Sequence, residues 1–232
     1  MENVRIISIE NLVKRFPMGK GEFTALNGIG LSFSQGEFAG LIGPSGSGKT
    51  TLLNIIGSLD VPTSGSVTVL GRSVGDLGAR EAARLRKENL GFIFQSYNLF
   101  AVHNVYENVE FPLLLLKISS TDRRKMVLDA LEWVGLTDKI KSKPPQLSGG
   151  ECQRVAIARA MVKKPSLVLA DEPTANLDAD NSHNILKTME NLNRELRTSF
   201  LFATHDEKVI SYLRRKIFLV DGRVKDDIVV AN

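Results

Sequence analysis

Short, continuously apolar segments alternate with amphipathic ones along much of the chain. The apolar segments are residues 37–42, 90–94, 165–171 and 199–204. Runs of this length are typical of strands buried on both faces of a parallel sheet. Between and after them, the pattern predicts helices at 51–56, 80–87 and 182–196. This alternation indicates an α/β domain with a mostly parallel core sheet.

Other regions depart from the alternation and predict antiparallel strands. Between residues 4 and 38, apolar positions recur every second residue, which predicts strands and turns. A turn at 62–66 precedes a predicted strand at 67–70, which Gly71 ends. Residues 217–224 predict a hairpin on the Asp221–Gly222 turn. We therefore expect an antiparallel β lobe beside the parallel sheet.

From about residue 98 to 162 the pattern becomes helical. Apolar residues between Asp122 and Val134 lie at helical spacing, and Gly135 is a candidate C-cap. Two prolines in 143–146 then break the pattern. We expect one domain over residues 1–232. Its sheet-containing lobes comprise about 1–95 and 163–232, and a helical lobe is inserted at about 96–162.

Composition and charge narrow the class of protein. The net charge is +4, with basic residues scattered in short clusters, which favours a solvated surface over a nucleic-acid interface. No apolar run reaches the 18 residues that a membrane span needs, and the N-terminus lacks the build of a signal peptide. Cys152 is the only cysteine, so we expect a reducing compartment and no internal disulfide. Cys152 itself is open to two interpretations, an inert packed thiol or one that responds to oxidants.

The segment after the first buried strand fits the phosphate-binding pattern G-x-x-x-x-G-K-[ST]. It reads Gly43, Pro44, Ser45, Gly46, Ser47, Gly48, Lys49 and Thr50, and a predicted helix follows at once. Glycines let successive N–H groups point at one anion, and the N-terminus of the helix adds its positive dipole. In such a loop the lysine contacts the β- and γ-phosphates and the threonine hydroxyl binds Mg²⁺.

Polar residues follow three of the other predicted strands. Asp171 and Glu172 end one strand, Gln95 follows another and His205 follows a third. Because the carboxyl ends of parallel strands share one edge, we expect these side chains to face the ligand crevice. Asp171 suits the Mg²⁺ ligand role, Glu172 could polarise a water, and Gln95 could reach Mg²⁺ or that water. By position alone, His205 is either structural or functional.

Two further features allow both a structural and a functional interpretation. Ser148 and Glu151 form a capping box that starts a helix ending near Val162. A cap does not require Gly149 and Gly150, which suggest a second anion site. Phe16, at the end of the first strand region, is either an adenine platform or a core or edge residue; its local pattern favours the latter.

Together these motifs resemble the ATP-binding subunit of an ABC transporter over essentially the whole chain. Residues 43–50 match the Walker A motif and 167–172 match Walker B, while 147–154 resemble the family signature. Gln95, residues 175–178 and His205 match the Q-, D- and H-loops in order. Segments 58–65 and 91–99 resemble the lipoprotein-releasing and macrolide-export branch. The resemblance implies the ABC type of P-loop NTPase fold.

The resemblance also implies a mechanism in which two copies pair head to tail around two ATP molecules. Residues 43–51, including Thr51, would bind ATP and Mg²⁺, and Ser148, Gly149 and Gly150 would contact the γ-phosphate held by the other copy. Glu172 would be the general base, and His205 would hold the γ-phosphate and the water. Asp178 would couple the two sites, and Phe16 would stack on adenine.

The implied partners are a second copy and a separate membrane permease, without nucleic acid. The permease would hold the chain at the inner face of the cytoplasmic membrane, with a short helix docked near residues 95–116. Phe111 and residues 113–116 could contact that helix or simply fill the core.

Three positions depart from the family pattern, and one alternative function remains. Phe16 stands where tyrosine is more usual, Cys152 where glutamine is usual, and Ala175 where serine or glycine is common. The alternative is a soluble or force-transmitting ABC-type ATPase that drives assembly without transport. The sequence does not identify the cargo, its direction or the permease.

Overall fold

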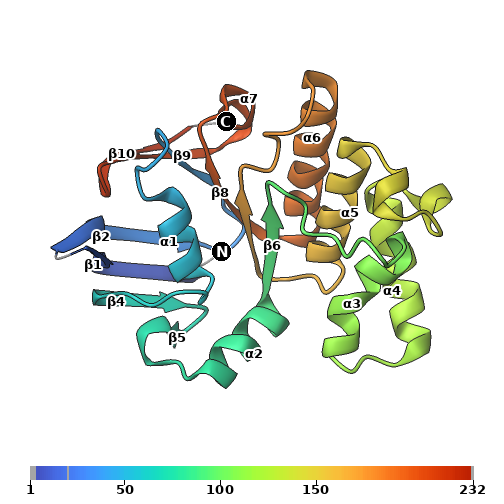
Figure 1. Cartoon of the computed structure of the whole chain (residues 1–232), viewed down its shortest axis with the longest axis horizontal. Helices are drawn as coiled ribbons and strands as arrows, with labels where there is room; N and C mark the ends of the chain where they lie inside the picture. Colours follow the sequence, from blue (N-terminus) through green and yellow to red (C-terminus); the bar gives the residue numbers. More distant parts are fainter. Residues whose placement is uncertain (1–3, 20, 231–232) are drawn as a thin grey trace.

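The computed structural model describes residues 4–19 and 21–230, which form two sheets and a group of helices (Figure 1). The antiparallel sheet has the order β2-β1-β4-β5 and contains β1 (Arg5–Met18), β2 (Gly21–Ser34), β4 (Ser64–Val69) and β5 (Arg72–Ser73). The larger sheet has the order β10-β9-β3-β8-β7-β6. Its strands are β3 (Phe38–Ile42), β6 (Leu90–Phe94), β7 (Leu167–Asp171), β8 (Ser199–Thr204), β9 (Arg215–Val220) and β10 (Arg223–Val229).

Helices surround the larger sheet, in which every neighbouring pair is parallel except β9 and β10. They are α1 (Lys49–Ile56), α2 (Ala79–Asn89), α3 (Val105–Leu115), α4 (Ser120–Trp133), α5 (Gly149–Met161), α6 (Ala179–Leu196) and α7 (Glu207–Tyr212). Short 3₁₀ turns occur at Val74–Asp76, Thr137–Lys139 and Pro144–Gln146. In Figure 1 the antiparallel sheet lies on one side of the large sheet and α3 and α4 lie on the other. The predicted fold class is confirmed.

Two hydrophobic cores use opposite faces of the larger sheet. In β8, Phe200 and Phe202 join the core that includes α3, α4, α5 and α6, while Leu201 and Ala203 join the core with α1 and the antiparallel sheet. Successive strand residues point to opposite faces, so a strand covered on both sides must be apolar throughout. This double burial is why β7 and β8 read as continuous apolar runs.

Several element boundaries follow from local chemistry. The predicted C-cap at Gly135 has φ +65°, and Leu136 N–H donates to Leu131 C=O, which is the hydrogen bond of a Schellman motif. Asp221 and Gly222 both have positive φ, as a tight hairpin turn requires. β4 begins at Ser64, earlier than predicted, because Ser64 and Ser66 pair with Val13 and Glu10. Leu70 lies beyond it, in a turn with φ +49°.

The division into sheet-containing and helical lobes at about 95 and 163 remains a prediction. The described part of 96–162 contains only helices and turns, yet α5 packs in the same core as Ile93 and Val168 of the sheet. Among the described residues, no helix has both the length and the apolar character that crossing a bilayer requires.

Asn108 holds the start of the helical region together from inside the protein. Its fully buried side chain accepts a hydrogen bond from Phe100 N–H (2.8 Å) and donates to the carbonyls of Phe100, His103 and Asn104 (3.0–3.2 Å). These bonds tie the loop before α3 to the helix itself. A buried polar group with this many partners is expensive to truncate.

We predict that Asn108→Ala lowers the free energy of unfolding by about 2–4 kcal/mol, because it leaves buried backbone groups without partners. Urea unfolding followed by circular dichroism measures this change. Asn184→Ala, at an exposed position of α6, serves as the control and should change stability by less than about 0.5 kcal/mol. Equal effects of the two substitutions would contradict the structural role of Asn108.

Candidate active site

The loop between β3 and α1 curls around the side chain of its own lysine. Lys49, which is only 7% exposed, donates from Nζ to the carbonyl oxygens of Gly43 (2.6 Å) and Pro44 (3.0 Å). Gly48 is the N-cap of α1 with φ +101°, and no side chain caps the helix there. A Cβ on Gly48 would lie 2.7 Å from the carbonyl oxygen of Ala25, so the loop also packs closely on β2. The first-turn N–H groups of α1 are left without an intrahelical acceptor, as an anion site requires.

Thr50 and Asp171 bring two oxygen ligands together beside this loop. The Thr50 hydroxyl donates to Asp171 Oδ2 (3.0 Å) and lies 3.3 Å from Oδ1. Burial raises the pKa of Asp171, and the neighbouring Glu172 raises it further, while Thr50 and Lys49 act in the opposite direction. Carboxylate and hydroxyl oxygens are the donors that Mg²⁺ prefers, and a divalent cation would offset the burial of this carboxylate. The residues therefore fit the predicted metal.

Glu172 and His205 also meet at the edge of the sheet. His205 Nδ1 lies 2.6 Å from Glu172 Oε1, and the Thr204 hydroxyl donates to Glu172 Oε2 at 2.9 Å. Glu172 has φ +45°, a conformation that is uncommon outside glycine and is concentrated at functional sites. Thr204 escaped the sequence interpretation, although its place directly before His205 at a strand end was a usable signal.

Gln95 and the turn at 175–178 lie near each other, and Gln95 directly follows Phe94, the strand partner of Asp171. The Asn176 side chain donates to the carbonyl oxygen of Gln95 (3.0 Å). Asp178 is the N-cap of α6 and accepts from the backbone N–H and the side-chain amide of Asn181. These hydrogen bonds lower the pKa of Asp178. The structure thus gives Asp178 a capping role that the sequence analysis did not assign.

The predicted capping box at the start of α5 is present. Glu151 N–H donates to Ser148 Oγ (3.2 Å), and Ser148 N–H donates to Glu151 Oε2 (2.7 Å). A Cβ on Gly150 would lie 2.6 Å from Asn181 Oδ1, and one on Gly149 would lie 3.0 Å from the hydroxyl of Tyr97. Close approach within the chain therefore explains both glycines in part. Ser148 and Gly149 are nevertheless exposed, at a surface formed with Tyr97 and Asn181 rather than with residues 43–51.

The exposure of Phe16 and the burial of Cys152 bear on the two interpretations that the sequence left open for each. Phe16 belongs to β1, opposite Phe23, and its ring is partly exposed with Lys14 Nζ 4.9 Å from its centre. Its exposure is compatible with a stacking role. Cys152 is buried with Sγ 3.6 Å from the carbonyl oxygen of Pro144, and burial raises the pKa of its thiol. A buried thiol with a raised pKa is a poor nucleophile, which favours the packed interpretation.

A glycine-rich phosphate loop at the start of a helix, with an acidic strand end beside it, defines a P-loop NTPase. The ABC transporter family profile matches residues 26–175. The chain belongs to that family as an ATP-hydrolysing, ATP-binding subunit.

Similar proteins agree with this assignment over nearly the whole chain. The lipoprotein-releasing system ATP-binding protein LolD of Pseudoalteromonas translucida is 45% identical, with 96% of each chain covered. The macrolide export ATP-binding/permease protein MacB of Burkholderia pseudomallei is 41% identical over 96% of this chain but only 34% of its own length. The dimeric structure of MJ0796, a bacterial ABC transporter cassette, superposes with a TM-score of 0.90 at 39% identity, covering 98% of this chain and all of that one. A second MJ0796 structure, also dimeric, is in a post-hydrolysis state bound to ADP and phosphate.

We predict that Asp171→Asn raises the melting temperature of the nucleotide-free protein by about 2–4 °C at neutral pH, equivalent to about 1 kcal/mol for a domain of this size. The native carboxylate has a raised pKa, so its ionisation destabilises the fold as pH rises, whereas asparagine never ionises. The difference should therefore shrink as pH falls through the raised pKa of Asp171. Thermal unfolding from pH 4 to 8 tests this, with the exposed Asp226→Asn as control. A variant that melts below the native protein at every pH would contradict it.

Proposed function

We propose that two copies of this chain close head to tail around two ATP molecules, each bound by the phosphate loop of one copy and by Ser148, Gly149 and Gly150 of the other. The observation that carries this proposal is that one chain has two separate glycine-rich helix N-termini, one at the start of α1 and one at the start of α5. Ser148 and Gly149 are exposed and contact Tyr97 and Glu151, not the lysine loop. The dimeric MJ0796 cassette gives a precedent for such pairing.

The phosphate loop binds the triphosphate through its backbone and its lysine. Residues 43–51 other than Pro44 supply N–H groups, and Lys49 exchanges the carbonyls of Gly43 and Pro44 for phosphate oxygens. Thr50 and Asp171 would hold Mg²⁺, with Gln95 as a further candidate ligand. When bound, Mg²⁺ neutralises charge on the β- and γ-phosphates. Phe16 offers a face to the adenine, and its missing hydroxyl does not weaken stacking.

Glu172 acts as the general base for the attacking water. The hydroxyl of Thr204 fixes one of its carboxylate oxygens, and His205 contacts the other. When ATP is bound, His205 turns to the γ-phosphate and the water, which frees Glu172 Oε1 to accept the proton. Asp178, at the start of α6, reaches across the dimer and couples the two sites.

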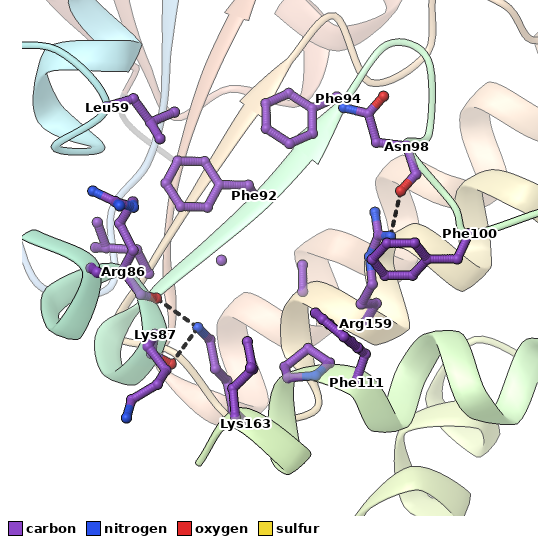
Figure 2. A pocket seen from close by; sticks show the side chains of 16 residues that line it. Leu59, Arg86, Lys87, Phe92, Phe94, Asn98, Phe100, Phe111, Arg159 and Lys163 are labelled. Carbon is purple, nitrogen blue, oxygen red and sulfur yellow. Dashed lines mark hydrogen bonds between the residues drawn. The ribbon is translucent and has the colours of Figure 1, made fainter. Parts of the chain in front are cut away.

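A separate membrane permease converts closure of this dimer into work, and it holds the chain at the cytoplasmic face of the membrane. A groove between the two lobes supports this step, with Phe111 of α3 on one wall and α2 on the other (Figure 2). The exposed Leu115 of α3 also lines it. By contrast, Leu113 is fully buried and belongs to the core. The names of LolD and MacB suggest lipoprotein release or export of an amphipathic substrate as the task.

We predict that Glu172→Gln keeps ATP binding and lowers turnover by about 10²–10⁴, because the amide cannot accept the proton. Phosphate release measures turnover, and size-exclusion chromatography with ATP should show an accumulated dimer. Glu207→Gln, on the neighbouring helix α7, should hydrolyse ATP at nearly the native rate. Normal turnover in Glu172→Gln would remove Glu172 from its role.

We predict that Ser148→Arg abolishes hydrolysis while leaving ATP binding to the monomer intact, because the bulky cation blocks the partner's γ-phosphate. Equilibrium dialysis with labelled ATP measures binding at low protein concentration. Ser119→Arg is the control, since it removes a similar N-cap, that of α4, at another surface. Loss of monomer binding in Ser148→Arg would mean that the signature acts within one chain.

The transport proposal is tested by capturing the partner. Tagged Glu172→Gln protein is expressed in its own host, and the membranes are solubilised with ATP present. Mass spectrometry then identifies the chains that co-purify. A polytopic membrane protein supports the proposal, whereas only soluble partners would favour an ATPase that drives assembly.

A further inference from the structure

Gln153 is a fully buried polar side chain that the fold satisfies only in part. It lies in α5, where its Nε2 donates to the carbonyl oxygen of Pro173 at 2.6 Å. Its Oε1 has no hydrogen-bond partner among the described residues. Burying an unpaired carbonyl oxygen is unfavourable, and an aliphatic side chain of the same size would avoid it. The amide therefore calls for an explanation other than core packing.

The hydrogen bond from Gln153 reaches the loop that carries Glu172. Pro173 directly follows Glu172 and is buried. Because proline has no N–H, its carbonyl oxygen is the only backbone group of Pro173 that can form a hydrogen bond, and Gln153 donates to it. The backbone of Glu172 is thus held on both sides, since its own N–H donates to the carbonyl of Ala203 at 2.9 Å.

This restraint matters because the backbone of Glu172 is in the left-handed region, with φ +45°. That conformation is less favourable than the right-handed one for a residue with a side chain. A loop with one anchor fewer can rotate out of it, and the Cα–Cβ bond of Glu172 then leaves β7 in another direction. Thr204 and His205 contact the carboxylate, but they do not fix the backbone from which the side chain starts.

We propose that Gln153 is a positioning residue for Glu172 of its own chain, because it keeps the segment after Glu172 in the orientation that directs the carboxylate at the attacking water. The proposal rests on the proposed role of Glu172 as general base, which it deepens by naming the group that holds the adjoining backbone. A misplacement of about 1 Å at a reacting group can reduce a rate by about 10²-fold. Loss of Gln153 should therefore slow hydrolysis without weakening ATP binding by residues 43–51.

The helix that carries Gln153 has a second task in the proposed dimer. Its N-terminus, at Ser148 to Gly150, would contact the ATP bound by the other copy. Gln153 lies one turn further along and holds the loop of the copy's own base. A loss of turnover in a Gln153 variant could therefore arise at either ATP, and the experiment has to separate the two.

Gln153→Met tests the inference, because methionine has nearly the same size but cannot donate a hydrogen bond. Phosphate release gives kcat and KM, equilibrium dialysis gives ATP affinity, and circular dichroism melting verifies folding. Val155→Ala is the matched control. Val155 is fully buried on the same helix and belongs to the hydrophobic core, so its truncation loosens α5 without removing a hydrogen bond to the loop.

We expect Gln153→Met to lower kcat by about 10- to 100-fold and to leave KM and ATP affinity within about twofold of the native values. Val155→Ala should lower the melting temperature and keep kcat within about twofold. In the Glu172→Gln background, Gln153→Met should have no further effect, because both substitutions disable the same step. Equal losses of kcat in Gln153→Met and Val155→Ala would overturn the inference, since general loosening of α5 would then explain both.

Mixed dimers show which ATP is affected. By mass action, an excess of Glu172→Gln protein of about tenfold pairs nearly every copy that keeps Glu172 with an inactive one. Gln153→Met should lower turnover when it is placed in the copy that keeps Glu172, and it should have no effect in the Glu172→Gln copy. The reverse result would mean that Gln153 acts on the partner's ATP through the N-terminus of α5, which contradicts the inference.

Two outcomes separate this inference from the role of Glu172 itself. If Glu172→Gln hydrolyses ATP at the native rate, Glu172 is not the base, and the inference fails with it. If Glu172→Gln is inactive while Gln153→Met turns over normally, the inference alone is refuted.

Discussion

The parallel register of β3, β8 and β7 is the constraint on which the site depends. Ile42 pairs with Thr204, and Asp171 pairs with Ala203, so all three strands end at nearly the same level. The lysine loop, His205 and the Asp171–Glu172 pair therefore emerge side by side, although Thr50 and Asp171 are 121 residues apart in the sequence and Glu172 and His205 are 33 apart. Because each strand is buried on both faces, a slip in register would displace these groups and disrupt both cores together.

Several residues of the proposed site also have a role in the fold. Ser148 caps α5 and Asp178 caps α6, and both lie at helix N-termini, where backbone N–H groups need acceptors. Gly150 makes room for Asn181, whose amide also donates to Asp178. The start of α5 thus packs closely against the start of α6. In the proposed dimer, a displacement of one of these helix ends would displace the other.

Hydrogen bonds also link the groove to the site. Arg159 of α5 donates to the carbonyls of Tyr97 and Asn98, which both have positive φ and follow Gln95 and Ser96 in the chain. Asn176, two residues before Asp178, holds the carbonyl of Gln95 itself. A partner bound in the groove would contact Arg159, which is itself hydrogen-bonded to the loop that carries Gln95. In the proposed transporter, the side chains of Arg159 and Asn176 would link docking to ATP hydrolysis, because both donate to backbone carbonyls of the segment 95–98.

The sequence by itself determined the fold class, the phosphate loop, the order of the family motifs and most element boundaries. Those features are visible in the local sequence: β7 and β8 are continuous apolar runs, and Gly135 and Asp221–Gly222 favour turns. Only the tertiary structure decided which polar groups meet. The contacts of Thr204 with Glu172 and Asn181 with Asp178, and the raised pKa of Asp171, involve neighbours or burial that a linear pattern does not reveal. Burial and pairing are properties of packed surfaces, and they exist only when distant segments come together.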